Sequence, residues 1–104
     1  MPHEKDTLTV ALAQIAPVWF DREKTLAKVC ENIFAASSAG CQLVAFGEAL
    51  VPGYPFWLEY SQITDFNSAF HKGFHAEYID QAVCIERGDL QDLCGLAREK
   101  KIAV

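Results

Sequence analysis

One acidic residue stands apart from the other charged residues of this chain. Glu48 is the only charged residue between Glu31 and Glu59. The residues on either side of it are apolar or glycine: Phe46, Gly47, Ala49, Leu50 and Val51. An ionised carboxylate is costly to bury without a partner, so a carboxylate kept in such a segment is a candidate general base. The alternative is an ordinary solvent-exposed loop acid, and composition and spacing alone favour neither.

The other potentially reactive side chains show no comparable pattern. The chain has four cysteines, Cys30, Cys41, Cys84 and Cys94. They form no C-x-x-C pair and have no histidine at ligand spacing, so we expect buried, reduced thiols rather than disulfides or a zinc site. His71 and His75 are four residues apart and could share a helix face, but no acidic third ligand is evident. We therefore expect no metal site.

A strand, a helix and a second strand are predicted before Glu48. Residues 8–15 form a short apolar run ended by Pro17, which favours a strand buried on both faces. Asp21 is a good N-cap for a helix that ends at Gly40, and the apolar stripe of this helix comprises Leu26, Val29, Cys30, Ile33 and Phe34. Residues 43–46 form a second buried strand. Parallel pairing with a right-handed crossover then puts Glu48 just beyond the carboxyl end of a strand, where α/β proteins build active sites.

Further helices are predicted after Glu48. Residues 52–55 form a turn, followed by a short helix over 56–62 and a longer one over 66–83. A turn at Arg87-Gly88 leads into a third clear helix that Asp89 caps, with an apolar stripe of Leu90, Leu93, Cys94 and Ala97. Residues 102–104 resemble the opening of a third strand. A natural terminus rarely abandons a buried strand so early, so we infer that residues 1–104 are a truncated domain.

Length and composition limit the classes of protein to consider. The 104 residues are 51% hydrophobic and 22% charged, which fits one small folded domain. The net charge of −5 comes without a basic stripe, so neither nucleic acid nor an anionic membrane is an expected partner. The polar N-terminus lacks the apolar stretch of a secretion signal, and no segment reads as a membrane span. We expect a cytoplasmic protein.

The segment around Glu48 resembles the first catalytic motif of the nitrilase superfamily of carbon–nitrogen hydrolases. That motif is an acidic residue after a buried strand, followed by a Gly-Tyr-Pro-type turn, and residues 43–55 read Leu-Val-Ala-Phe-Gly-Glu-Ala-Leu-Val-Pro-Gly-Tyr-Pro. The likeness extends in the right order over nearly the whole chain. One departure is Gly47, where many members have proline. The form of the motif is closest to the true nitrilase branch.

The resemblance implies a fold, a reaction and a set of residues. The fold is α/β, the N-terminal part of a four-layer α-β-β-α sandwich. The reaction uses a Glu-Lys-Cys triad in which Glu48 is the general base, with no metal or organic cofactor. Tyr54 and Trp57 are candidate substrate-binding walls, although both could equally be filling the core. The catalytic Lys and Cys of the family come later than this segment, so we expect the chain alone to be inert.

Two other interpretations stay open on the sequence. The same triad also serves amidases and N-carbamoyl hydrolases, so the small-molecule substrate is a nitrile or an amide. A non-catalytic α/β binding or assembly module, in which Glu48 has only a structural role, is the alternative from another class. The resemblance also implies a homo-oligomer for an intact member of the family.

Overall fold

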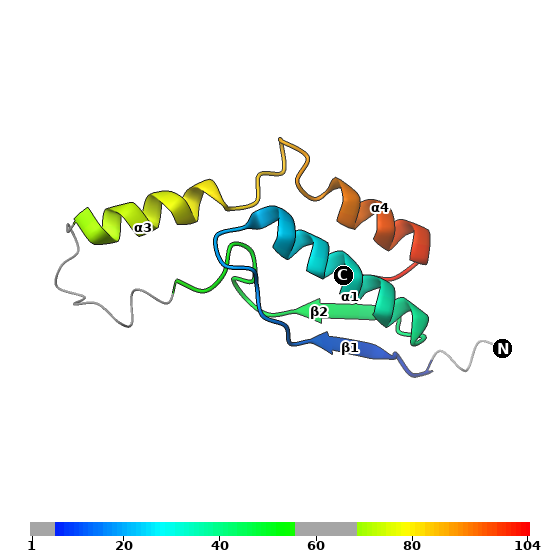
Figure 1. Ribbon diagram of the computed structural model, residues 1–104. Coiled ribbons are helices and arrows are strands. Elements are labelled where there is room, and N and C mark those ends of the chain that lie inside the picture. Colours follow the sequence, from blue (N-terminus) through cyan, green and yellow to red (C-terminus); the bar gives the residue numbers. More distant parts are fainter. Residues whose placement is uncertain (1–5, 56–68) are drawn as a thin grey trace.

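The computed structural model describes residues 6–55 and 69–104, the latter without the side chains of residues 69–71. Its elements follow one another along the chain as β1 (Val10–Ala13), α1 (Arg22–Ser38), β2 (Leu43–Phe46), α3 (Ala69–Asp80) and α4 (Gln91–Lys100). Helix α1 lies over the sheet and α4 packs beside α1 (Figure 1). This is an α/β arrangement, as the sequence predicts. The helix predicted over 56–62 falls outside the described residues.

The sheet contains the parallel pair that the strand–helix–strand order predicts. Strands β1 and β2 pair in parallel, with Val10 opposite Leu43. On the other edge of β2, Ala103 forms a parallel bridge with Leu43. The Val44 N–H donates to the Ala103 carbonyl at 2.8 Å, and the Ala103 N–H donates to the Gln42 carbonyl at 2.9 Å. The segment after α4 therefore begins to pair beside β2.

Helix α1 begins and ends at the residues that the sequence indicates. The Asp21 carboxylate accepts a hydrogen bond from the Lys24 N–H at 3.0 Å, which satisfies one of the free N–H groups of the first turn. At the other end Gly40 has φ +84°. Its N–H donates to the Ser37 carbonyl and the Cys41 N–H donates to the Ala36 carbonyl, each at 3.0 Å. These two bonds make a Schellman C-terminus, for which glycine is the preferred residue.

The core lies between α1, β2 and the segment after α4. Its buried apolar residues are Val29, Ile33, Ala36, Val44 and Ile102. The predicted apolar stripe of α1 was only partly right, because Thr25 and Ala36 are buried whereas Phe34 is 52% exposed. Phe34 comes one residue after the fully buried Ile33 and is rotated about 100° around the helix from it. Its ring instead lies 4.6 Å from the Lys100 ammonium.

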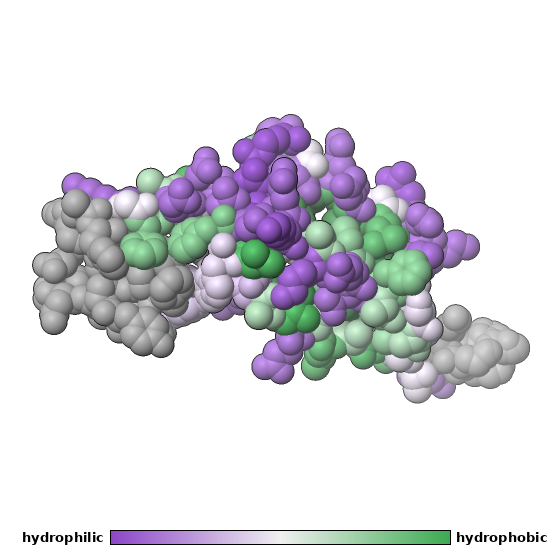
Figure 2. All heavy atoms as spheres, viewed as in Figure 1, coloured by the Kyte–Doolittle hydropathy of each residue, from purple (hydrophilic) through white to green (hydrophobic). Residues whose placement is uncertain are grey.

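Burial of β1 on both faces, as the sequence predicted, is wrong for this chain. Ala11 and Ala13 pack against the core, but Val10 is 41% exposed and Leu12 is 80% exposed. Side chains alternate between the faces of a strand, and the described helices cover one face only. Figure 2 accordingly shows apolar side chains gathered at the lower side of the view, where β1 lies.

The C-terminal helices differ from the prediction at their ends. Helix α3 ends at Asp80, before the end of the predicted range of 66–83, and the first residues of that range lie outside the described part of the chain. Helix α4 has Leu90 at its N-cap with no side-chain cap, so the prediction of Asp89 as the cap is wrong. Its predicted stripe also missed Leu96, which packs on the core, and included Cys94, which is exposed. Among the described residues, no helix is long and apolar enough to cross a membrane.

Candidate active site

Glu48 lies two residues beyond the end of β2, in the turn that follows it. This is the carboxyl end of a parallel strand, as predicted. Glu48 is exposed in this chain, a point that the apolar sequence around it had left open. The next residue, Ala49, has φ +59°, a left-handed conformation that is unusual for a residue other than glycine.

The segment from Glu48 to Gly53, called the Glu48 turn below, contacts an aromatic ring at its Gly53 end. Gly53 is buried and has φ +117°. A Cβ added at Gly53 would lie 2.6 Å from both Cε3 and Cζ3 of Trp19, and 3.4 Å from Cγ of Pro17. The backbone of Gly53 thus contacts the Trp19 ring directly, at a distance that only glycine allows. Between these points Leu50 packs against the core.

The loop that carries Trp19 is bound to α1. The Thr25 hydroxyl accepts from the Val18 N–H and donates to the Val18 carbonyl, each at 3.0 Å, and Thr25 is only 1% exposed. The Lys28 ammonium donates to the Ala16 carbonyl. Sequence reasoning missed Trp19 and Thr25 as parts of the site. The Pro17 and Gly53 signals in the sequence mark the two turns but not the contact between them.

The predicted substrate walls are only partly described. Tyr54 follows Gly53 and is 53% exposed, beside the Glu48 turn in the chain. Trp57 lies outside the described residues. An aromatic lining formed by Tyr54 and Trp57 therefore stays a prediction.

The thiols are free, as predicted, but they are less buried than expected. Cys30, Cys41 and Cys84 are half-buried and Cys94 is exposed, because the helix faces that carry Cys30 and Cys94 do not point at the sheet. Burial, and to a smaller extent the negative charge of Asp92, raises the pKa of the Cys30 thiol. A raised pKa disfavours the nucleophilic thiolate. In the part of the chain that the structure describes, no three His, Cys, Asp or Glu side chains cluster as metal ligands.

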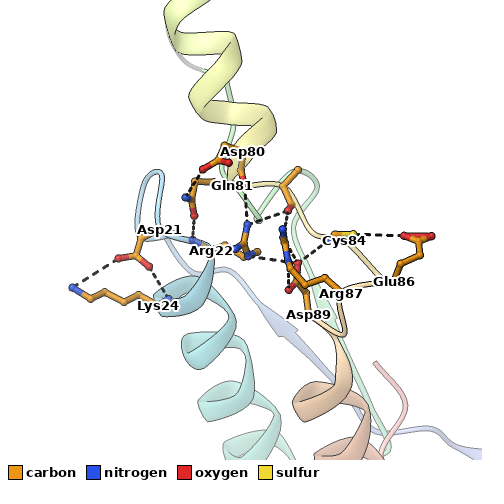
Figure 3. Close-up of polar contacts among 10 residues, drawn as sticks. Asp21, Arg22, Lys24, Asp80, Gln81, Cys84, Glu86, Arg87 and Asp89 are labelled. Carbon is orange, nitrogen blue, oxygen red and sulfur yellow. Dashed lines mark hydrogen bonds and ion pairs between the residues drawn. The ribbon is translucent and has the colours of Figure 1, made fainter.

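A compact ionic cluster joins the start of α1 to the segment between α3 and α4 (Figure 3). Asp89 accepts from Arg87 Nε at 2.9 Å and Nη2 at 2.6 Å, and from the Cys84 N–H at 2.8 Å. Arg22 Nε lies 3.5 Å from the same carboxylate. The hydrogen bond from Arg87, followed by that from the Cys84 N–H, holds the pKa of Asp89 well below its ordinary value. These bonds occupy the carboxylate that was predicted to cap α4.

Arg22 also connects this cluster to the end of α3. Its backbone N–H donates to Gln81 Oε1, and its Nη1 donates to the Asp80 carbonyl, each at 2.8 Å. Phe20, which directly precedes the α1 cap, packs against Phe74 of α3 with 5.9 Å between ring centroids. The loop that ends at Trp19 and Phe20 is therefore held by Thr25 of α1 and by Phe74 of α3.

The sequence profile of the carbon–nitrogen hydrolase family matches residues 9–104. The chain belongs to this family. An arylacetonitrilase of Hypocrea virens is 38% identical over 95 residues, which are 91% of this chain and 27% of the relative. An aliphatic nitrilase of Rhodococcus rhodochrous is 37% identical over 101 residues, 95% of this chain and 26% of the relative. An arylacetonitrilase of Aspergillus oryzae is 33% identical over 91% of this chain. The chain thus spans about a quarter of the length of the curated relatives it matches.

Proposed function

We propose that this chain is the N-terminal part of a thiol-dependent nitrilase that converts a nitrile to a carboxylic acid and ammonia. The observation that carries the proposal is the place of Glu48, in a turn immediately beyond the carboxyl end of parallel strand β2. The relatives named as an arylacetonitrilase and an aliphatic nitrilase support nitriles over amides. A homo-oligomer and a cytoplasmic location belong to the same proposal.

The proposed reaction requires a thiol, a cation and a base. A cysteine thiolate adds to the nitrile carbon and gives a thioimidate once the nitrogen takes up a proton. Water adds, ammonia leaves, and a thioester remains. A second water releases the acid and restores the thiol, so one nitrile and two waters give one acid and one ammonia. Glu48 takes and returns the protons in these steps, and a lysine stabilises the negative charge that develops.

We further propose that residues 1–104 alone do not catalyse this reaction. Of the four thiols, Cys30 has a raised pKa, which opposes the thiolate. The Cys84 thiol donates a hydrogen bond to the Glu86 carboxylate, with 3.6 Å between sulfur and oxygen. Release of ammonia from a nitrile by the purified chain would contradict this part of the proposal.

The function is tested on the longer protein that the coding sequence beyond Val104 encodes, where a downstream Lys and Cys are expected. Ammonia release is measured on phenylacetonitrile, on an aliphatic nitrile and on the matching amides. Glu48→Gln should lower kcat by at least about a hundredfold, the lower range for loss of a general base. Glu48→Asp keeps the carboxylate and serves as the control. Turnover of amides but not nitriles would identify an amidase instead, and a stop codon after Val104 would favour the non-catalytic module.

A further inference from the structure

We infer that Trp19 is a positioning residue for Glu48, and this inference rests on the function proposed above. Glu48 and Gly53 belong to one turn, and the Gly53 end of that turn lies on the Trp19 ring. A carboxylate that must reach one proton in a substrate needs a fixed backbone beneath it. Trp19 supplies that support although it lies 29 residues before Glu48 in the chain.

The Trp19 ring can act as a support because its own backbone is fixed. Thr25 binds both the N–H and the carbonyl of Val18, the residue before Trp19. The Asp21 N–H also donates to the Val18 carbonyl, at 3.1 Å. Part-buried hydrogen bonds of this kind favour one loop conformation, since breaking them leaves polar groups unpaired. Helix α1 thus fixes Val18, and the adjacent Trp19 ring contacts the Glu48 turn at Gly53.

The contact of Gly53 with the Trp19 ring adds an anchor at the end of the turn that lies away from β2. Leu50 packs against the core beside β2. Between Leu50 and Gly53 the chain has no strand or helix to hold it, and Ala49 is in a left-handed conformation that costs energy. Leu50 packs on the core and Pro52 is buried, and the ring adds a further contact at Gly53. We therefore expect loss of the ring to loosen the turn without unfolding the core.

The first experiment uses NMR on the complete 104-residue chain. In the unaltered chain, the Hα resonance of Gly53 should be shifted upfield by the Trp19 ring, and the amides of Glu48 and Gly53 should have order parameters of about 0.85. Trp19→Leu should abolish the upfield shift and lower these order parameters below about 0.6, while Ile33 and Val44 in the core stay near 0.85. A spectrum without the Gly53 shift, or an equal loss of order in the core and the turn, would overturn the inference.

The second experiment measures catalysis in the longer protein. Trp19→Leu should lower kcat by at least about tenfold and change KM by less than about threefold, because the turn carries the base rather than the substrate contacts. Trp19→Phe keeps a flat ring and should restore kcat to within about threefold. Ile85→Ala removes a side chain that is 72% exposed and serves as the control for loss of surface apolar area.

The two proposals fail in different ways. If Glu48→Gln lowers kcat and Trp19→Leu does not, the positioning role of Trp19 is wrong and the function of Glu48 stands. If Glu48→Gln leaves kcat unchanged, the proposed function is wrong, whatever the NMR experiment shows about the ring contact.

Discussion

Substitution of Gly53 by alanine would bring a Cβ to 2.6 Å from two carbons of the Trp19 ring. Two costs follow. A residue with a side chain at φ +117° is strained by about 1–3 kcal/mol. Overpacking against a neighbour adds about 1–3 kcal/mol, and Trp19 is 44% exposed, so its ring has room to shift and the lower half of that range applies. We expect Gly53→Ala to lower the free energy of unfolding by about 2–5 kcal/mol.

Gly40→Ala is the matched control because Gly40 also has a positive φ, +84°, but has nothing within 4 Å of an added Cβ. It should cost only about 1–2 kcal/mol. Urea unfolding followed by far-UV circular dichroism measures both variants. A chain of this size has about 5–15 kcal/mol of stability, so both losses are measurable. The double variant Trp19→Leu/Gly53→Ala removes the ring, and the added cost of alanine there should approach that of Gly40→Ala.

A Gly53→Ala variant that costs no more than Gly40→Ala would refute the role of the ring, because the ring contact would then contribute nothing beyond backbone strain. Alanine at position 53 that costs as much in the Trp19→Leu background as in the unaltered chain would refute it as well.

Three further predictions test other parts of the same region. Ala49→Gly removes the penalty of φ +59° and should leave the free energy of unfolding unchanged or raise it by up to about 1 kcal/mol. The control, Ala35→Gly inside α1, should lower the free energy of unfolding by about 1 kcal/mol in the same urea assay. Thr25→Val leaves the part-buried Val18 N–H and carbonyl without the hydroxyl and should lower the free energy of unfolding by about 1–3 kcal/mol, while Thr25→Ser should retain most of the stability. The pKa of Asp89 is lowered in the folded chain, so its stabilising contribution is complete above the unfolded value of about 3.9 and is lost as the pH falls below that. Asp89→Asn should therefore lower the urea midpoint at pH 7 and have a smaller effect at pH 3.

Each of these predictions has an outcome that contradicts it. Equal losses for Ala49→Gly and Ala35→Gly would mean that the left-handed turn after Glu48 carries no strain. A Thr25→Val variant as stable as Thr25→Ser would mean that the hydroxyl does not hold the Val18 loop. An effect of Asp89→Asn that is the same at both pH values would mean that its charge is not what stabilises the junction between α1 and the segment that connects α3 to α4.

The sequence correctly predicted the elements whose positions depend on a few neighbouring residues. The Asp21 cap and the Gly40 terminus of α1 were predicted because each satisfies backbone groups within four residues of itself. Strand β2 and its parallel partner followed from the order of apolar runs. Asp89 was misassigned because Asp is a good cap in isolation, and nothing in the local sequence shows that Arg87 and the Cys84 N–H bind it instead.

Burial was harder to predict than the elements, since it depends on which parts of the molecule are brought together. An apolar run such as that of β1 indicates that both faces can be buried, but whether Leu12 is covered depends on what packs over that face. The same reason explains Glu48. Its place in the chain fixed its position past β2, whereas the apolar residues beside it say nothing about which side chains approach the carboxylate.

The contact between Trp19 and Gly53 shows most clearly the difference between what a local sequence signal predicts and what depends on the fold. A glycine in a Pro-Gly-Tyr-Pro turn is expected for its backbone freedom, and that expectation is met by φ +117°. The tighter requirement comes from a ring 34 residues earlier, which leaves no room for a Cβ. Two independent constraints thus act on one residue of the motif that contains Glu48. A glycine that served only the turn could be replaced at the cost of strain alone, whereas one that also contacts Trp19 can be replaced only if the ring or the turn that carries the candidate base moves.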